Sequence, residues 1–202
     1  MGFLREIFGP SKEEVWQELC NQIGGEMKGG FWGGNKVEIR VKEWIIILDT
    51  YTVSTGKSST TYTRMRSPYV NRDGFQFAIY RQGFFSEVGK VFGMQDIETG
   101  DSEFDRNFQI QGNDEFKARE LFANPKIRYL IQQQPSIHFE VKDDEGWFRA
   151  SFPEKVDELY FQVTGVIKDV ERLKSLYELF AETLNQLCHI GSAYEDDPNL
   201  RL

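Results

Sequence analysis

Two arginines and a tyrosine alternate along a predicted strand in a pattern suited to binding an anion. Tyr62, Arg64 and Arg66 are each separated by one residue, and alternate residues of a β-strand share a face. An aromatic ring beside two guanidinium groups fits a carboxylate or phosphate, because each guanidinium can donate paired hydrogen bonds. These three residues are our candidate ligand-binding site. The alternative is that both arginines pair with acids on neighbouring strands, which an acidic chain supplies freely.

Two carboxylates adjoin strongly apolar sequence and are the strongest candidates for acid-base chemistry. Asp49 follows the apolar run 44–48, and Asp157 precedes Leu159. Acid-base catalysis requires two such groups in opposed environments, one desolvated and one solvated. Acids that merely end a strand in water show the same pattern. We therefore assign no catalytic residue.

The few cysteines and histidines do not form a nucleophilic or metal site. Cys188 and His189 are adjacent, but neighbouring residues of a helix do not face each other. We expect Cys188 and Cys20 to be buried thiols in a reducing cytoplasm, and whether the two approach each other stays open. His138 lies on the polar face of its strand, without a partner at metal-ligand spacing. We expect no metal and no cofactor.

Two short motifs resemble known ligand loops, but each lacks a required residue. Gly56, Lys57 and Ser58 match the end of a phosphate-binding loop, yet Tyr51 occupies the position of its first glycine. A turn between two strands fits this segment better. The acids of residues 101–105 have the spacing of a calcium loop, but position 106 is not glycine and position 112 is not glutamate. We expect loop acids without calcium.

The N-terminal half of the chain predicts one helix followed by strands. Ser11 and Glu14 form a capping box, which begins a helix over residues 12–22. After a glycine-rich segment, residues 29–34, the apolar period changes to two. We expect these strands to form an antiparallel meander: 37–41, 44–48, 59–66 and 75–79.

The C-terminal half predicts a mixture of short elements and one long helix. Apolar residues step by three and four from Val170 to Cys188, between an Asp169 cap and Gly191. About 20 residues at 1.5 Å each give a helix of roughly 30 Å, long enough to cross a sheet. The other expected elements are a short helix 86–92, a strand containing Phe104, Phe108 and Ile110, a helix that Asn113 or Asp114 caps and that runs through Phe122, a helix 125–132, a hairpin of 137–141 with 147–152, and a strand 159–163.

These elements predict an α+β fold, an extended antiparallel sheet packed against a long C-terminal helix and shorter helices. We expect a single globular domain over residues 1–202, with a frayed tail at 192–202. The seventeen Phe residues would suit a small apolar ligand between the sheet and the terminal helix. Aromatic residues at core spacing also serve simply as core.

Composition restricts the compartment and the partners. The chain has 202 residues and a formal net charge of −8, which disfavours a nucleic-acid partner because phosphate backbones repel it. Its longest unbroken apolar run, residues 44–48, is far below the roughly 20 residues of a membrane span. Residues 1–8 lack the pattern of a signal peptide. We expect a cytoplasmic protein with no membrane span.

One stretch of the sequence carries a resemblance to a known family. Phe104-Asp105, Phe108 and Asp114-Glu115 lead into a helix bearing Ala118, followed by Ile127-Arg128-Tyr129-Leu130. This order resembles the core of the bacterial family named domain of unknown function 3137, over roughly residues 83–190. The resemblance implies a bacterial origin and an α+β fold, and it assigns no chemical role to any residue. The family carries membrane segments ahead of this domain, which we do not expect here.

The sequence therefore favours a non-enzymatic cytoplasmic binding or assembly module with an anion-binding strand face. Its partner would be a protein or a small anionic ligand, and homo-oligomerisation is left open. The alternative is an enzyme, such as a hydrolase, whose site the sequence does not reveal.

Overall fold

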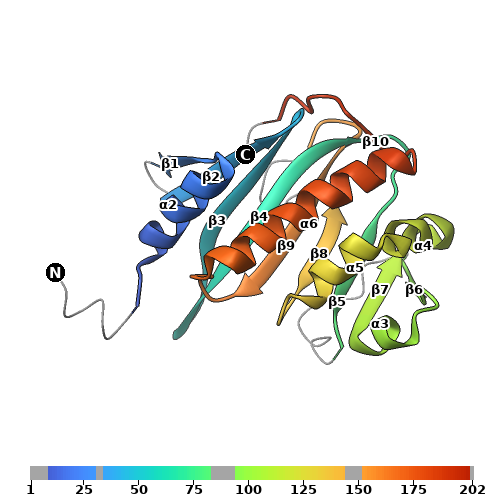
Figure 1. Ribbon diagram of the computed structural model, residues 1–202, viewed down its shortest axis with the longest axis horizontal. Coiled ribbons are helices and arrows are strands. Elements are labelled where there is room, and N and C mark those ends of the chain that lie inside the picture. The colour runs from blue at the N-terminus through green and yellow to red at the C-terminus, as the bar shows by residue number, and fades with distance from the viewer. Residues whose placement is uncertain (1–8, 31–33, 83–93, 144–151, 201–202) are drawn as a thin grey trace.

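The computed structural model describes residues 9–30, 34–82, 94–143 and 152–200. Within them, ten strands form one antiparallel sheet, and helices α2, α4, α5 and α6 lie on one face of it (Figure 1). The order across the sheet is β1-β2-β3-β4-β9-β8-β5-β7-β6, and β10 pairs with β4. The predicted α+β fold, with an extended antiparallel sheet and a long C-terminal helix, is confirmed.

The first helix, α2 (Lys12–Ile23), begins at the predicted capping box. The Ser11 hydroxyl accepts a hydrogen bond from the Glu14 N–H at 3.2 Å, and the Glu14 carboxylate accepts one from the Ser11 N–H at 2.9 Å. The helix ends at Gly24, whose φ of 74° is the left-handed conformation that glycine adopts readily. Both ends are thus set by local residue types, which is why the sequence predicts them.

Four consecutive strands then form a meander, of which the last three correspond to the predicted strands 37–41, 44–48 and 59–66 and the first, over residues 26–30, is additional. Two-residue turns connect the second strand to the third and the third to the fourth, at positions 42–43 and 56–57. Lys42 and Gly56 have positive φ in these turns, as tight hairpins require. The strands are β1 (Glu26–Gly30), β2 (Gly34–Val41), β3 (Trp44–Thr55) and β4 (Ser58–Asn71).

The fifth strand, β5 (Phe77–Arg81), does not continue this meander, so the prediction is wrong at that point. Two later strands, β9 (Val156–Thr164) and β8 (His138–Lys142), lie between β4 and β5. The side chains of β9 are buried on both faces along most of its length. Such a strand is stable only in the middle of a sheet, so it displaces β5 from the side of β4.

The middle of the chain forms small elements at the far edge of the sheet. Phe104 is in a helix and not in the predicted strand, because the Asp101 carboxylate accepts the N–H groups of Glu103 and Phe104 and caps that helix. Asp114 and Pro125 begin the next two helices as predicted. These elements are β6 (Gln95–Ile97), α3 (Ser102–Asn107), β7 (Phe108–Gly112), α4 (Glu115–Ala123) and α5 (Pro125–Gln132).

The terminal helix, α6 (Val170–His189), runs obliquely across the sheet, as predicted (Figure 1). Its buried stripe includes Leu176 and Phe180. The Phe180 ring lies 5.3 Å from that of Phe139 in β8, and the Phe139 ring lies 5.7 Å from that of Phe77 in β5. These aromatic side chains pack against one another as a core.

The segment after α6 is docked at its start, so the predicted fraying is wrong for residues 192–194. The strand β10 (Ala193–Tyr194) pairs with β4, and Ser192 is buried. The Arg72 N–H donates to the Ser192 carbonyl at 2.9 Å. Because β3 pairs with β4 only up to Arg66, the last residues of β4 have an open edge on that side, which β10 occupies.

Some predicted elements lie outside the described residues: the short helix 86–92, nearly all of the strand 147–152, and the two aromatic residues of the glycine-rich segment 29–34. Among the residues that are described, no helix is both long and apolar enough to cross a bilayer.

Candidate functional site

One face of the sheet carries the predicted site, and no helix of the described residues covers it (Figure 1). We call it the open face because no helix of the described residues lies on it, although Arg64, Arg66, Glu140, Glu158 and Tyr160 on this face are buried. It is made by the side chains that alternate with the core residues along four adjacent strands. They are Asp49 and Tyr51 of β3, Tyr62, Arg64 and Arg66 of β4, Glu158, Tyr160 and Gln162 of β9, and His138, Glu140 and Lys142 of β8.

Both arginines of the predicted site bind one carboxylate, that of Asp49. Asp49 lies directly opposite Arg64 in the register of β3 and β4. The Arg64 Nε and Nη2 atoms donate to the two Asp49 oxygens at 2.8 and 2.7 Å, and Arg66 Nη2 donates to Oδ2 at 3.1 Å. The three side chains are 6–13% exposed. This is a nearly buried, paired arrangement in which the carboxylate lies between two guanidinium groups.

Arg66 extends the charge network to the next strand. Its Nε atom lies 3.7 Å from Oε1 of Glu158 in β9, a residue with no exposed surface. A buried carboxylate costs several kcal/mol in lost hydration unless a cation compensates it. Arg66 therefore links the acids of β3 and β9 across β4.

Tyr62 joins this unit through a second tyrosine. Its ring stacks on that of Tyr51, with centroids 5.2 Å apart and planes 17° apart. The Arg64 guanidinium lies 5.0 Å from the Tyr51 centroid, within range of a cation–π interaction. The structure thus places Tyr62, Arg64 and Arg66 on one face, as the alternation predicts.

Sequence analysis did not assign to this site the two residues that link its members, Asp49 and Tyr51. A signal for both was present, because counting outward from the turn at residues 56–57 places Asp49 opposite Arg64 and Tyr51 opposite Tyr62. The same geometry fits the alternative in which the arginines pair with cross-strand acids. Anion binding by these three residues stays a prediction.

Gln162 connects the tyrosines to the other half of the open face. Its Oε1 atom accepts hydrogen bonds from the Tyr51 hydroxyl at 2.6 Å and from the Tyr160 hydroxyl at 2.8 Å. Its amide nitrogen then faces His138 Nδ1 at 3.3 Å. An amide donor at this position requires Nδ1 to be the acceptor, so the network assigns the proton of a neutral His138 to Nε2.

Glu140 ends this chain of contacts on β8. Its Oε1 atom lies 3.2 Å from His138 Nε2 and 3.0 Å from Lys142 Nζ. Burial raises the pKa of Glu140, but hydrogen bonds and charges from His138 and Lys142 outweigh burial, and the net pKa is lowered. Burial and the neighbouring Tyr51 raise the pKa of Tyr160. At neutral pH Glu140 is therefore charged and Tyr160 is protonated.

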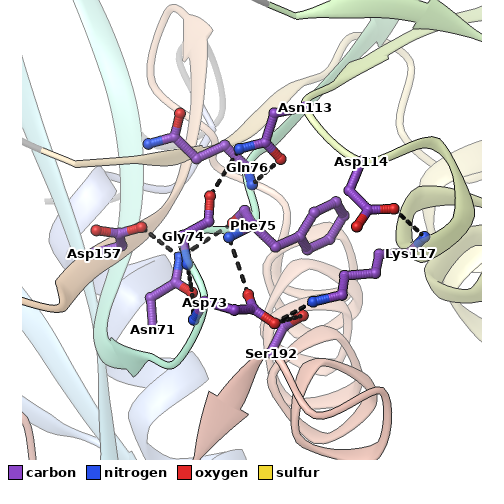
Figure 2. Close-up of polar contacts among 10 residues, drawn as sticks. All are labelled: Asn71, Asp73, Gly74, Phe75, Gln76, Asn113, Asp114, Lys117, Asp157 and Ser192. Carbon is purple, nitrogen blue, oxygen red and sulfur yellow. Dashed lines mark hydrogen bonds and ion pairs between the residues drawn. The ribbon is translucent and has the colours of Figure 1, made fainter.

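Asp157 lies on the helix-covered face, on the other side of the sheet from Asp49. Its carboxylate accepts a hydrogen bond from the Asn71 side-chain amide (Figure 2). Burial is the main cause that raises the pKa of Asp157. The two acids that the sequence singled out are thus separated by the sheet, and they do not form an acid-base pair.

The contacts around Asn71 hold the turn between β4 and β5 (Figure 2). The Asn71 amide nitrogen also donates to the Phe75 carbonyl at 3.1 Å, and its oxygen accepts the Gly74 N–H at 3.0 Å. Asp73 accepts from the Lys117 ammonium group and from the Ser192 hydroxyl. This cluster fastens α4 and the C-terminal segment to the turn, which is a structural role.

Both cysteines are free thiols, but only Cys20 is buried as predicted, and Cys188 is half-buried. Burial raises the pKa of each thiol. A raised pKa keeps the thiol protonated and makes it a poor nucleophile. Within the described parts of the chain, no group of three or more His, Cys, Asp or Glu side chains could hold a metal ion.

The hairpin of β3 and β4 extends beyond the rest of the sheet (Figure 1). The strand β2 pairs with β3 only up to Leu48, and β9 pairs with β4 only from Tyr62 onward. We call residues 52–61 the arm. Among the described residues, its two strands have ladder partners only in each other.

Side-chain hydroxyl groups connect the two strands of the arm. Three facing pairs lie within hydrogen-bond distance: Thr52 and Thr61 at 2.9 Å, Ser54 and Ser59 at 2.9 Å, and Thr55 and Ser58 at 3.2 Å. The residues from 52 to 59 are exposed, and Val53 among them is 43% exposed. The arm is thus a regular ribbon whose order comes from cross-strand pairing and not from burial.

Comparison with solved structures finds the same overall fold in a mycobacterial protein. The crystal structure of the mycobacterial trehalose monomycolate transport factor A, TtfA, superposes with a TM-score of 0.51 and 6% sequence identity, covering 87% of this chain and 94% of that one. At this identity the likeness concerns the fold. The sequence matches no family model and no curated protein, so the resemblance to domain of unknown function 3137 stays a prediction.

Proposed function

We propose that this chain is a non-enzymatic cytoplasmic binding or assembly module that contacts its partner through the arm. The observation that carries the proposal is the arm itself, a regular two-stranded ribbon that extends past the sheet and buries little of its own surface. Fixing the backbone of one residue costs about 1 to 2 kcal/mol, and an isolated hairpin is at best marginally stable in water. A contact made by the arm would offset that cost.

The backbone edge of the arm supports this proposal. Proteins protect exposed strand edges with charged residues or proline. The outermost strand β1 follows this rule, because it carries Glu26 and Lys28. Between residues 50 and 61 the only charged side chain is Lys57, in the turn. The ammonium group of Lys12 reaches this edge only at Thr50, with Nζ 3.4 Å from Oγ1, and the part of β3 beyond Thr50 is suited to a partner that adds a strand.

The open face supports the arm from its base. Arg64 and Arg66 fix Asp49 of β3 against β4, and the stacked rings of Tyr51 and Tyr62 lie directly before and after the arm in sequence. A rigid base reduces the conformational entropy that the arm loses when a partner binds. The free thiols fit a reducing cytoplasm.

The anion-binding site of Tyr62, Arg64 and Arg66 is a second candidate, favoured by one observation. Asp49 Oδ2 accepts from both arginines at once, so the site already holds one carboxylate between two guanidinium groups. A ligand carboxylate or phosphate would have to replace it. Titration with inorganic phosphate followed by NMR tests this: saturable shifts at Arg64 and Arg66 that Arg66→Gln abolishes support it, and their absence refutes it.

The arm is tested by shortening it without disturbing its register. Deleting residues 52–55 together with 58–61 leaves Gly56 and Lys57 between Tyr51 and Tyr62, which face each other as a hydrogen-bonded pair like Thr55 and Ser58, so the two-residue turn is retained. Because the arm buries little surface, we expect the melting temperature to fall by no more than about 2 °C. Native mass spectrometry of the protein purified from its own source should then lose the partner's mass.

The matched control is Ser54→Ala with Ser59→Ala, which removes one hydroxyl pair and keeps the backbone edge. The control should retain the partner. An unchanged complex after shortening contradicts the proposal. A bound lipid, such as the trehalose monomycolate after which the mycobacterial transport factor is named, would appear in the same spectra as a small added mass that shortening leaves in place.

A further inference from the structure

We infer that the arm's partner is a second copy of this chain, which pairs antiparallel along the same edge of β3 about a two-fold axis at Thr52. The inference rests on the proposed role of the arm and specifies which protein binds to it. It follows from the direction of the backbone groups, the register that they allow and the charge of the residues that would meet.

The direction of the backbone groups follows from the turns at the two ends of β3. Trp44 pairs with Val41 across one two-residue turn, and Thr55 pairs with Ser58 across the other. Residues that flank such a turn bond across it, so the N–H and C=O of Trp44 face β2 and those of Thr55 face β4. Because these groups alternate along a strand, the groups of Thr50, Thr52 and Ser54 face the open edge.

The open edge begins where β2 stops. Leu48 is the last residue of β3 that pairs with β2, and no other strand of the described residues pairs with that side of β3, which leaves residues 49–55 for an added strand. Seven residues span about 24 Å, which is ordinary for a paired strand. Adding a strand here leaves every existing ladder of the sheet in place.

An antiparallel register centred on Thr52 uses all three outward-facing residues of both copies. It places Thr52 opposite its own equivalent and Thr50 opposite Ser54 of the second copy. Each of these facing pairs can exchange two backbone hydrogen bonds. On the other side of the strand the register places Val53, which is 43% exposed, opposite Tyr51. Threonine pairs and aromatic–β-branched pairs are both favourable across strands.

The charges favour this edge over other places where two copies could meet. Each chain carries a net charge of −8, so two copies repel over most of their surfaces. Of residues 49–55 only Asp49 is charged, and it is bound to Arg64 and Arg66 on the open face. By contrast, pairing of the edge strand β1 with itself about its centre would place Lys28 opposite Lys28, which is unfavourable.

The pairing is tested by sedimentation equilibrium of the purified full chain over micromolar concentrations. Thr52→Pro removes an N–H that only the added strand would use, and proline is tolerated at such an edge position. We expect the dimer dissociation constant to rise at least about tenfold. Thr52→Val, which keeps the N–H, is the matched control and should dimerise like the wild type.

A charge exchange tests the two-fold register and does not depend on how proline is accommodated. Thr52→Lys and Thr52→Glu should each weaken self-association, because the register places like charges opposite each other. An equimolar mixture of the two variants should regain it. Failure of the mixture to associate contradicts the register.

A wild-type chain that stays monomeric at all concentrations overturns the inference, and so does a dimer that Thr52→Pro leaves unchanged. Either result is distinguishable from failure of the proposed function. If arm shortening still removes a partner from the native complex while the isolated chain is monomeric, the arm binds a different protein. If neither the dimer nor a native complex responds to changes in the arm, both proposals fail.

Discussion

Asp49 is the residue on which the arrangement of both arginines depends. Its carboxylate accepts from Arg64 at two atoms and from Arg66 at one, and all three side chains are nearly buried. A buried charge that loses its partner keeps its full cost of lost hydration. The contribution of Asp49 to the free energy of unfolding is therefore best measured by replacing its carboxylate and leaving the arginines in place.

We predict that Asp49→Asn lowers the free energy of unfolding by about 3 to 5 kcal/mol. The asparagine side chain can replace one hydrogen bond and none of the charge, so both buried guanidinium groups lose the carboxylate that they share. Urea unfolding at neutral pH measures the change. The control Glu13→Gln, whose side chain is 53% exposed, should change stability by less than about 0.5 kcal/mol. Equal, small effects for both variants would show that the network contributes little.

Asp157 gives a pH dependence of known sign. Its folded-state pKa is raised, mainly by burial and to a smaller extent by the charge of Asp143. Below the ordinary pKa of about 3.9, Asp157 is protonated in both the folded and the unfolded state, and its contribution to the free energy of unfolding is greatest. That contribution is lost as the pH rises through the folded-state pKa, because the buried carboxyl group then ionises. The charged form of Asp157 therefore destabilises the protein at neutral pH.

We predict that Asp157→Asn gains stability relative to the wild type as the pH rises from about 4. The asparagine oxygen can still accept the Asn71 amide hydrogen bond but cannot ionise. Urea unfolding of both proteins across the acidic range measures the difference, which should level off above the folded-state pKa. A difference that shrinks with rising pH would mean that Asn71 stabilises the charged carboxylate.

Elements whose boundaries are set by nearby residues could be predicted from the sequence. The position of a strand that pairs with a distant part of the chain could not. Helices α2, α4, α5 and α6 begin at Ser11, Asp114, Pro125 and Asp169, and each of these residues acts within one helical turn. The shared face of Tyr62, Arg64 and Arg66 follows from the period of a strand. The contribution of Gln162 depends on β9 pairing with β4, about a hundred residues away, which no local signal specifies.

The segment after α6 shows the same limit. Its polar composition predicts fraying, yet the open edge at the end of β4 provides it with partners. Ser192 also contacts Asp73 through its hydroxyl group, within the cluster that holds the turn between β4 and β5 (Figure 2). The packing of this segment is therefore a property of the assembled sheet.

We predict that truncation after Gly191 lowers the free energy of unfolding by about 1 to 3 kcal/mol. It removes β10 and two hydrogen bonds of Ser192, to the Arg72 N–H and to the Asp73 carboxylate, and each such bond contributes about 0.5 to 1.5 kcal/mol. Truncation after Glu195 keeps these contacts and should be nearly neutral. Thermal and urea unfolding of the two truncated chains provide the comparison, and equal stabilities would show that the docked segment is not stabilising.

At the scale of the whole molecule, the two faces of the sheet have different roles. One face binds the helices through a core of aromatic rings, and the other carries a network of charged and polar side chains that links β3, β4, β9 and β8. The arm continues from that network into solvent. The α+β class could be predicted from the sequence, whereas the place of the arm depends on where β2 and β9 stop pairing, which only the assembled sheet defines.

Amide hydrogen exchange along the arm tests most directly the claim that its edge is a contact surface. The exchange rates of Thr50, Thr52 and Ser54, whose N–H groups face the open edge, are compared between dilute isolated protein and the native complex. Tyr51 and Val53, whose N–H groups face β4, serve as internal controls. We predict that the first three exchange fast in isolation and become strongly protected in the complex, while the two controls are slow in both. Equal exchange of Thr50, Thr52 and Ser54 in the two states would contradict the account.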